Sequence, residues 1–276
     1  MPPESDTSPV VLTEVTDRIG TITMNRPGRR NALNPELIAA LDEAVRAMAD
    51  DQEVNVVILT GAAPDGKFGG FCSGGDTKDG GALRGSPNRD PRSTAGVPTD
   101  ALTGDLARHD SHASMRLHLM PKPTIAMIGG PAVGAGCSLA AACDFRFASH
   151  DAVFASSFSS NGLSGDYGGS FFWTQIMGTA RTRELYFLND KIPAARALAM
   201  GMVHAVLPAA ELRDYTLEIA RRLLRTPAAL LALVKDNMNQ AEYEVDRRRY
   251  LFAHEAENQQ RSVSDIASRM KTRPTA

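Results

Sequence analysis

The chain has 276 residues, of which 43% are hydrophobic and 22% are charged, and its formal net charge is −2. A globular chain of this length can bury a large core, and its near-neutral charge argues against nucleic acid as the main partner, because phosphate binding needs a concentrated basic surface. Three cysteines without CxxC spacing predict a reduced, cytoplasmic protein. The sequence shows no secretory signal and no apolar run long enough for a membrane span, so we expect no membrane partner.

The first third of the chain predicts a hairpin, a helix and a buried strand. Residues 10–15 and 20–25 are two short strand patterns around a turn. A helix is predicted from Asn34, a capping residue followed by Pro35. One face of this helix carries its apolar residues, namely Leu37, Leu41, Ala44, Val45 and Met48. The run VNVVILTG, residues 54–61, is typical of a strand that is buried on both faces.

The rest of the chain predicts further crossover units and then helices. A helix near residues 106–119 is followed by strands at 123–130, 145–149 and 152–157. Strands that alternate with helices predict a mainly parallel sheet. From Thr182 onward the predicted elements are almost all helical, at residues 193–203, 209–225, 227–241 and 243–261. We therefore expect an α/β core in residues 1–181 and a helical C-terminal part in residues 182–276.

One long segment breaks this pattern. Residues 79–105 are rich in Gly, Pro, Ser and Thr and have no hydrophobic period. A long loop of this kind is expected to be mobile, either as a lid over a site or as a disordered segment, and the sequence leaves both open.

Two glycine clusters have a composition suited to anion binding. FCSGGDTKD, residues 71–79, follows the buried strand, and GPAVGAGCSLAAACD, residues 130–144, precedes an apolar helix. The first turn of a helix offers unpaired N–H groups and a positive dipole end. Two N–H groups from separate loops would form an oxyanion hole. The alternative is that the glycines only allow close packing between a helix and a strand.

A third glycine cluster, NGLSGDYGGS at residues 161–170, surrounds Asp166. It lacks the lysine of a P-loop and the G-x-G-x-x-G pattern of a dinucleotide site, and its acid would repel phosphate. Asp166 is therefore either an acid/base group in a tight pocket or a cap for the following helix.

These motifs resemble the crotonase family, the enoyl-CoA hydratase/isomerase group. The matching stretches are NRPGRRNALN (25–34), VVILTG (56–61), FCSGGD (71–76), PKPTIAMIGGPAVGAGCSLAAACDFRFAS (121–149) and GLSGDYGGSFFWTQIMG (162–178). The resemblance implies a spiral of ββα turns, a helical C-terminal part for trimerisation, and a homotrimer or dimer of trimers. It also implies a coenzyme A thioester as substrate, without a separate cofactor.

The resemblance also assigns candidate site residues. Gly75 and Ala135 would supply the oxyanion-hole N–H groups. Ser73 and Asp76, which flank Gly75, would contact the substrate or its CoA part. Arg29 and Arg30 stand where family members contact the CoA nucleotide, although a solvated basic turn is an alternative. Phe158 and Trp173 would line the acyl pocket. Arg269 and Lys271 are candidates for further CoA-phosphate contacts.

The chain departs from the family's hydratases at two positions. Their two glutamates would fall at Ser138 and Phe158, so a two-glutamate hydration mechanism is excluded. Some members without this pair carry an aspartate at the position of Asp166, among them diene and ring-epoxide isomerases and aroyl-CoA dehalogenases. The primary hypothesis is that Asp166 moves a proton, in double-bond isomerisation or one-acid hydration.

Two alternatives remain open. Asp166 could be a nucleophile on an aromatic or cyclic acyl-CoA, or the chain could be a non-catalytic CoA-binding or scaffold protein. His109 and His112 share a helix face without a third ligand, so no metal site is expected. His112 could assist catalysis or be an exposed polar residue, and Asp144 is expected to have a structural role.

Overall fold

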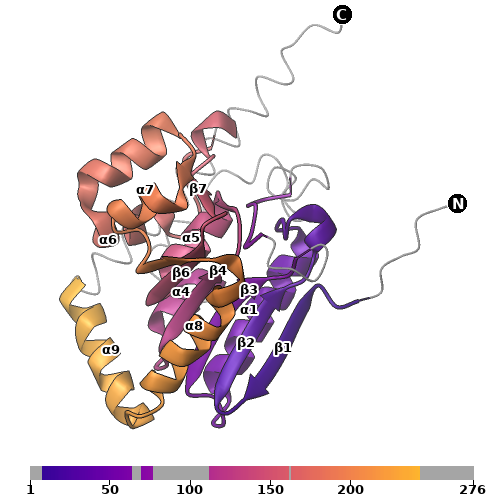
Figure 1. Ribbon diagram of the computed structural model, residues 1–276, viewed down its shortest axis with the longest axis vertical. Helices are drawn as coiled ribbons and strands as arrows, with labels where there is room; N and C mark the ends of the chain where they lie inside the picture. Colours follow the sequence, from indigo (N-terminus) through magenta and orange to yellow (C-terminus); the bar gives the residue numbers. More distant parts are fainter. Residues whose placement is uncertain (1–7, 64–69, 77–111, 162, 243–276) are drawn as a thin grey trace, which may run out of the picture.

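The computed structural model describes residues 8–63, 70–76, 112–161 and 163–242 (Figure 1). The predicted loop at 79–105, the predicted helix at 243–261 and the candidates His109, Arg269 and Lys271 lie outside these ranges.

The main sheet in the described part of the chain has six strands, in the spatial order β1-β2-β3-β4-β6-β9. These are β1 (Val11–Thr16), β2 (Ile19–Met24), β3 (Val56–Gly61), β4 (Thr124–Ile128), β6 (Phe145–Ser149) and β9 (Ala205–Leu207). The first two form the predicted antiparallel hairpin, and every other neighbouring pair is parallel. The expected mainly parallel sheet is confirmed.

Each face of this sheet is covered by helices because its central strands are apolar on both sides (Figure 1). Val57 and Leu59 of β3 join a core with α1 (Pro35–Asp50), α4 (Ala113–Leu119) and α5 (Ala135–Ala142). Val56 and Ile58 face α8 (Ala209–Leu223) in a second core. Alternation along one strand therefore fixes which helix lies on which side.

Helix α1 begins and packs as its sequence predicts. The Asn34 side chain accepts a hydrogen bond from the Leu37 N–H at 2.9 Å, and Pro35 occupies the first turn. The five apolar residues predicted for one face are the buried residues of this helix.

A small sheet and two helices follow the central strands. The small sheet consists of β5 (Ala132–Val133), β7 (Val153–Ala155) and β8 (Ile192–Pro193). Helix α6 (Gly169–Arg183) leads into a π-helical turn, η3 (Glu184–Leu188), and α7 (Ala194–Ala199) comes after β8. The expected domain boundary at residue 181 falls inside α6, and β9 from the C-terminal part pairs with β6. The two parts thus share one sheet.

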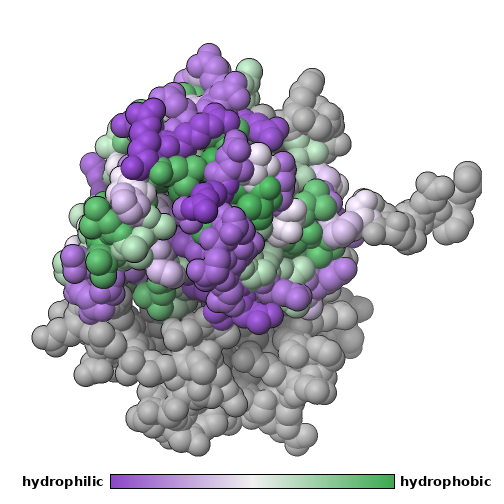
Figure 2. Space-filling view, turned by 90° about the horizontal axis from the view of Figure 1, so that it is seen from below, coloured by the Kyte–Doolittle hydropathy of each residue, from purple (hydrophilic) through white to green (hydrophobic). Residues whose placement is uncertain are grey.

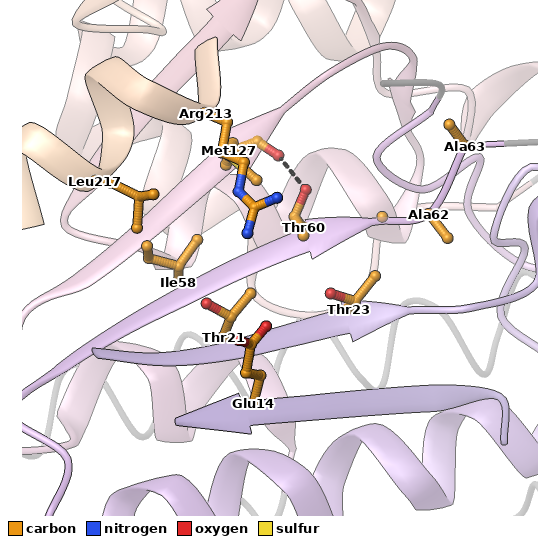
Figure 3. A pocket seen from close by; sticks show the side chains of 11 residues that line it. Glu14, Thr21, Thr23, Ile58, Thr60, Ala62, Ala63, Met127, Arg213 and Leu217 are labelled. Atoms are coloured by element: carbon orange, nitrogen blue, oxygen red, sulfur yellow. Dashed lines mark hydrogen bonds between the residues drawn. The ribbon is translucent and has the colours of Figure 1, made fainter. Parts of the chain in front are cut away.

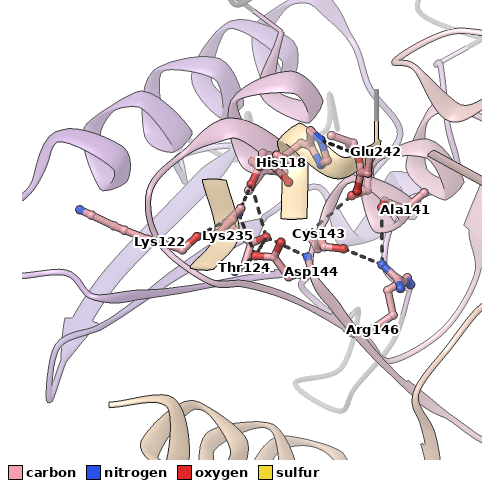
Figure 4. Close-up of polar contacts among 12 residues, drawn as sticks. His118, Lys122, Thr124, Ala141, Cys143, Asp144, Arg146, Lys235 and Glu242 are labelled. Atoms are coloured by element: carbon pink, nitrogen blue, oxygen red, sulfur yellow. Dashed lines mark hydrogen bonds and ion pairs between the residues drawn. The ribbon is translucent and has the colours of Figure 1, made fainter. Parts of the chain in front are cut away.

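Helix α9 (Ala228–Glu242) is fixed to the core by a buried lysine (Figure 4). The Lys235 ammonium donates to the carbonyl oxygens of Leu117 and Lys122 at 3.0 Å and pairs with Asp144 Oδ2 at 2.8 Å. The Thr124 N–H donates to the same carboxylate oxygen at 2.7 Å. This network gives Asp144 the structural contacts that were expected for it.

The surface combines hydrophilic and apolar regions. On the face seen in Figure 2, apolar side chains interrupt a mostly hydrophilic surface. One exposed apolar row runs along α9 through Leu230, Leu233, Val234 and Met238. Within the described ranges, no helix has the length and apolar character that crossing a bilayer requires.

Candidate active site

The two glycine clusters predicted to form an oxyanion hole are joined by backbone contacts. The Cys72 N–H donates to the Pro131 carbonyl oxygen at 3.1 Å, and the Val133 N–H donates to the Cys72 carbonyl oxygen at 2.9 Å. Gly74 and Gly134 adopt φ angles of 86° and 55°, which favour glycine. A Cβ on Gly74 would lie 2.8 Å from the Val133 carbonyl oxygen. The chain therefore needs glycine here to bring the loops together.

The structure leaves both predicted donors available. Gly75 is partly exposed, and Ala135 is the first residue of α5, whose N–H has no partner within the helix. Neither backbone N–H donates a hydrogen bond to any other residue in the described ranges. Two unpaired N–H groups on contacting loops, one at the positive end of a helix, are suited to bind an oxyanion.

The first of these loops is held in place by the turn at residues 26–33. The Asn31 side chain is fully buried and donates to the carbonyl oxygens of Ala62 and Gly70 at 3.0 and 3.1 Å. Arg26 pairs with the buried Asp76 carboxylate at 2.9 Å. Asp76 thus has a supporting contact that differs from the substrate contact expected of it, and Arg26 was not singled out by the sequence analysis.

Arg29 and Arg30 lie in the exposed short helix η1 (Pro27–Arg29) and its cap. The Arg30 carbonyl oxygen accepts a hydrogen bond from the N–H of Ser73, a partly exposed residue, at 3.1 Å. This basic turn is therefore the immediate neighbour of the loop that carries Gly75.

Asp166 lies half-buried on the loop before α6. Its Oδ1 accepts a hydrogen bond from the Tyr167 N–H at 2.8 Å, and its carbonyl oxygen accepts one from the Gly169 N–H at 3.2 Å. Gly168 occupies the N-cap position of the helix, which was the alternative role considered for Asp166. The carboxylate therefore precedes the cap residue by two positions.

A chain of contacts connects this loop to α4 and α1. The Tyr167 ring lies against the exposed His112 ring, with centroids 5.7 Å apart. The residue after His112, Ala113, donates its N–H to Asp42 Oδ1 of α1 at 2.7 Å. Burial raises the pKa of the Tyr167 phenol well above its ordinary value, and the charges of Asp166 and Asp42 raise it further. Burial also raises the pKa of Asp42, opposed by the bond from Ala113.

Ser138 and Phe158, the two positions without glutamate, are both buried. Phe158 stacks on Tyr186, with ring centroids 6.1 Å apart. A Cβ built on Gly169 would lie 2.5 Å from the Tyr186 phenolic oxygen and would also clash with Ser138 Oγ. Tyr186, which lies in η3, was not identified from the sequence. Trp173, expected in the pocket lining, has no exposed surface and packs inside the core.

A separate hollow of about 280 Å³ lies on the α8 side of the main sheet (Figure 3). Its lining includes three sheet threonines together with Glu14 and Arg213. Its lining includes Ala62 and Ala63, at the start of the segment that leads from β3 to Gly75, but not Gly75, Ala135 or Asp166 themselves. Among the described residues, no group of three His, Cys, Asp or Glu side chains could hold a metal ion.

Comparison with known proteins identifies the class. A crystal structure of an enoyl-CoA hydratase from Mycobacterium smegmatis matches with a TM-score of 0.72 at 29% identity, covering 94% of this chain and 100% of that one. A monofunctional enoyl-CoA isomerase, also from M. smegmatis, matches with a TM-score of 0.67 at 26% identity, covering 86% and 96%. The fold is therefore the crotonase fold, as the sequence resemblance implied.

Sequence comparison then gives the family. The family model for enoyl-CoA hydratase/isomerase matches residues 14–272. A 1,2-epoxyphenylacetyl-CoA isomerase of Escherichia coli strain K12 is 33% identical over 235 residues, which cover 84% of this chain and 82% of that protein. The chain belongs to the enoyl-CoA hydratase/isomerase family, whose members are enzymes that act on acyl-CoA thioesters.

Proposed function

We propose that this protein isomerises an acyl-CoA thioester, with the Gly75 and Ala135 N–H groups holding the thioester oxygen and the Asp166 carboxyl group moving the proton. One arrangement carries the proposal. Two unpaired N–H groups lie on contacting loops. Helix α6 begins three residues after Asp166, and its first residue, Gly169, packs against Ser138 of α5, the helix that begins with Ala135.

The proposed reaction is a proton shift between two carbons. The Asp166 carboxylate takes a proton from a carbon next to the double bond, and the electron pair moves onto the thioester oxygen. The two N–H groups stabilise that negative charge, and each such donor contributes roughly 10²–10³-fold to turnover. The protonated Asp166 then returns the proton to a different carbon, so nothing is gained or lost overall. Acid–base assistance of this kind contributes about 10²–10⁴-fold.

Isomerisation fits the site better than hydration. Hydration requires a water that is oriented as well as activated, and neither Ser138 nor Phe158 supplies a carboxylate for that purpose. Two relatives, the E. coli 1,2-epoxyphenylacetyl-CoA isomerase and the M. smegmatis enoyl-CoA isomerase, bear isomerase names. One-acid hydration is the second reaction that the same carboxyl group could support.

The test is a panel of enoyl-, dienoyl-, aroyl- and epoxyacyl-CoA thioesters, with product formation and deuterium exchange from D₂O followed by mass spectrometry. Asp166→Asn should lower turnover on the active substrate at least 100-fold and abolish exchange. Asp151→Asn, an exposed aspartate in the turn after β6, is the matched control. Full activity in Asp166→Asn would refute the proton-transfer role, and a covalent adduct on Asp166 would instead establish a nucleophile.

We also infer that the chain assembles as a homotrimer or a dimer of trimers. The apolar row on α9 supports this inference, because a row of this kind on one helix is suited to cover by another copy. The molar mass from light scattering tests it. Leu233→Glu should lower the mass, whereas a monomeric wild-type protein would contradict the inference. Three free buried cysteines favour a reducing compartment, and we propose the cytoplasm.

A further inference from the structure

The hollow on the α8 side of the main sheet has a partly polar floor (Figure 3). Elsewhere on this face, apolar residues such as Val56 and Phe147 form the core beneath α8. In the hollow, the strand register places Thr23 of β2 beside Thr60 of β3, and Thr21 lies two residues before Thr23 on the same face. Three hydroxyl groups are thereby gathered on neighbouring strands.

Two of these hydroxyl groups and one guanidinium group are available to a ligand. Thr60 already donates its hydroxyl to the Met127 carbonyl oxygen at 2.9 Å. The side chains of Thr21, Thr23 and Arg213 form no hydrogen bond or ion pair with any other residue that the structure describes. Arg213 points from α8 toward the strands (Figure 3). A guanidinium group has five N–H donors and no acceptor, so it is suited to bind a carboxylate.

The opposite side of the hollow carries a negative charge. Glu14 lies on β1, where it pairs with Thr21 of β2, and its carboxylate points into the hollow opposite Arg213 (Figure 3). Its Oε1 accepts a hydrogen bond from the Thr16 hydroxyl at 3.1 Å, but Glu14 and Arg213 form no ion pair with each other. This carboxylate repels a plain anion and attracts a cationic group. The two charges together favour a ligand that carries both signs.

The dimensions of the hollow limit the ligand to a small molecule. The hollow encloses about 280 Å³, and a water molecule's share of the liquid is about 30 Å³, so the space is that of roughly nine water molecules. Neighbouring strands lie about 4.8 Å apart, so β1 and β3 are separated by about 10 Å. A short aliphatic chain with a charged group at each end can therefore approach Glu14 and Arg213 at once.

We propose that this hollow binds a small zwitterion, an aliphatic amino acid whose carboxylate contacts Arg213 and the Thr21 and Thr23 hydroxyls and whose ammonium group faces Glu14. The site is separate from the proposed reaction centre, because its lining does not include the residues of that centre. Binding there does not depend on which thioester the protein converts, and it can be measured without an acyl-CoA.

Ligand-observed saturation-transfer NMR on the full chain tests the proposal. The probes are 4-aminobutanoate, 5-aminopentanoate and 6-aminohexanoate, each compared with the plain carboxylate and the plain alkylammonium ion of the same length. At least one amino acid should bind about threefold or more tightly than both of its partners, because an exposed charge contact contributes a factor of about this size. The preferred length reports the separation of the two charges.

Isosteric variants identify the groups that bind. Glu14→Gln should remove the advantage of the amino acid over the plain carboxylate. Arg213→Gln should weaken both of these ligands, and the double variant Thr21→Val with Thr23→Val should do the same. Glu14 and Arg213 are exposed, so their variants should unfold at the wild-type temperature. Arg222→Gln is the control, since Arg222 is an exposed arginine of α8 that does not line the hollow.

Three results would overturn the proposal. One is the absence of saturation transfer to every amino acid of the series. Another is a preference for the amino acid that Glu14→Gln and Arg213→Gln both leave intact. The third is binding of the plain carboxylates as tight as that of the amino acids and lost in Arg213→Gln, because the hollow would then be a site for simple anions.

Discussion

Replacing Gly136 by alanine should separate the two loops of the oxyanion hole. The added Cβ would lie 2.7 Å from the Cys72 Cβ and 2.8 Å from the Cys72 carbonyl carbon, whereas ordinary van der Waals contact begins at 3.4 Å. Cys72 is fully buried and its backbone is bonded to the second loop on both sides, so no flexible side chain can yield. The loops must therefore move apart by roughly 0.6 Å or more.

A displacement of this size should affect catalysis more than stability. Misplacement by about 1 Å can cost roughly 10²-fold in rate, and loss of one oxyanion donor costs about 10²–10³-fold. Overpacking of a core typically costs about 1–3 kcal/mol of folding free energy. We expect Gly136→Ala to remain folded and to lose about 100-fold in kcat.

The assay is kcat at saturating acyl-CoA, together with deuterium exchange at the acyl α carbon and thermal unfolding. Gly28→Ala is the control, because a Cβ there meets nothing within 4 Å and the residue has an ordinary φ. The reasoning about loop contact is refuted if Gly136→Ala turns over within about twofold of wild type. Equal losses in both glycine variants would also refute it, since the effect would then not depend on contact with Cys72.

Three further outcomes follow from contacts in the structure. Replacing Arg29 and Arg30 together by alanine should raise KM for an acyl-CoA. It should not raise KM for the acyl-pantetheine analogue, which lacks the nucleotide, and the control Arg222→Ala should change neither KM value. Lys235→Met should destabilise the fold by about 3–5 kcal/mol in chemical denaturation, because it leaves a carboxylate without its buried partner, while the exposed Lys191→Met should have almost no effect. Burial raises the pKa of all three cysteine thiols from 9.0 to about 12, so iodoacetamide should not label the folded protein at pH 8. Because only the unfolded chain releases these protons from pH 9 upward, the free energy of unfolding should fall between pH 9 and 12. Labelling of the native protein at pH 8 would contradict the burial of the thiols on which both predictions depend.

The regular elements could be predicted because local rules determine them. Helix α1 begins at Asn34 and buries the predicted apolar face, since capping and a 3.6-residue period act within one segment. Strand β3 is buried on both sides, as its continuous β-branched run indicated. The need for glycine at positions 74 and 134 could also be predicted, because both have positive φ angles and Gly74 also closely approaches the Val133 carbonyl oxygen.

The supporting side chains could not be predicted in this way. Arg26 and Asp76 are fifty residues apart and meet only because two loops fold over one another, so no local pattern marks the pair. Tyr186 lies in a π-helical turn, whose wider spacing departs from the helical period used to read that region. Trp173 was expected to line the acyl pocket because it is an aromatic residue close to Asp166 in the sequence, but the structure buries its side chain fully in the core.

Backbone groups and side chains have different proposed roles in this site, and this difference explains why family membership constrains its chemistry only in part. The groups proposed to stabilise the enolate are backbone N–H groups, which survive any change of side chain that leaves the loop contacts intact. The groups that would choose the reaction are side chains at positions 138, 158 and 166, which can change without altering the fold. Asp166→Asn should therefore still bind acyl-CoA with nearly wild-type affinity while losing turnover. Loss of binding in that variant would mean that Asp166 holds the loops together, and the separation between backbone and side-chain roles would fail.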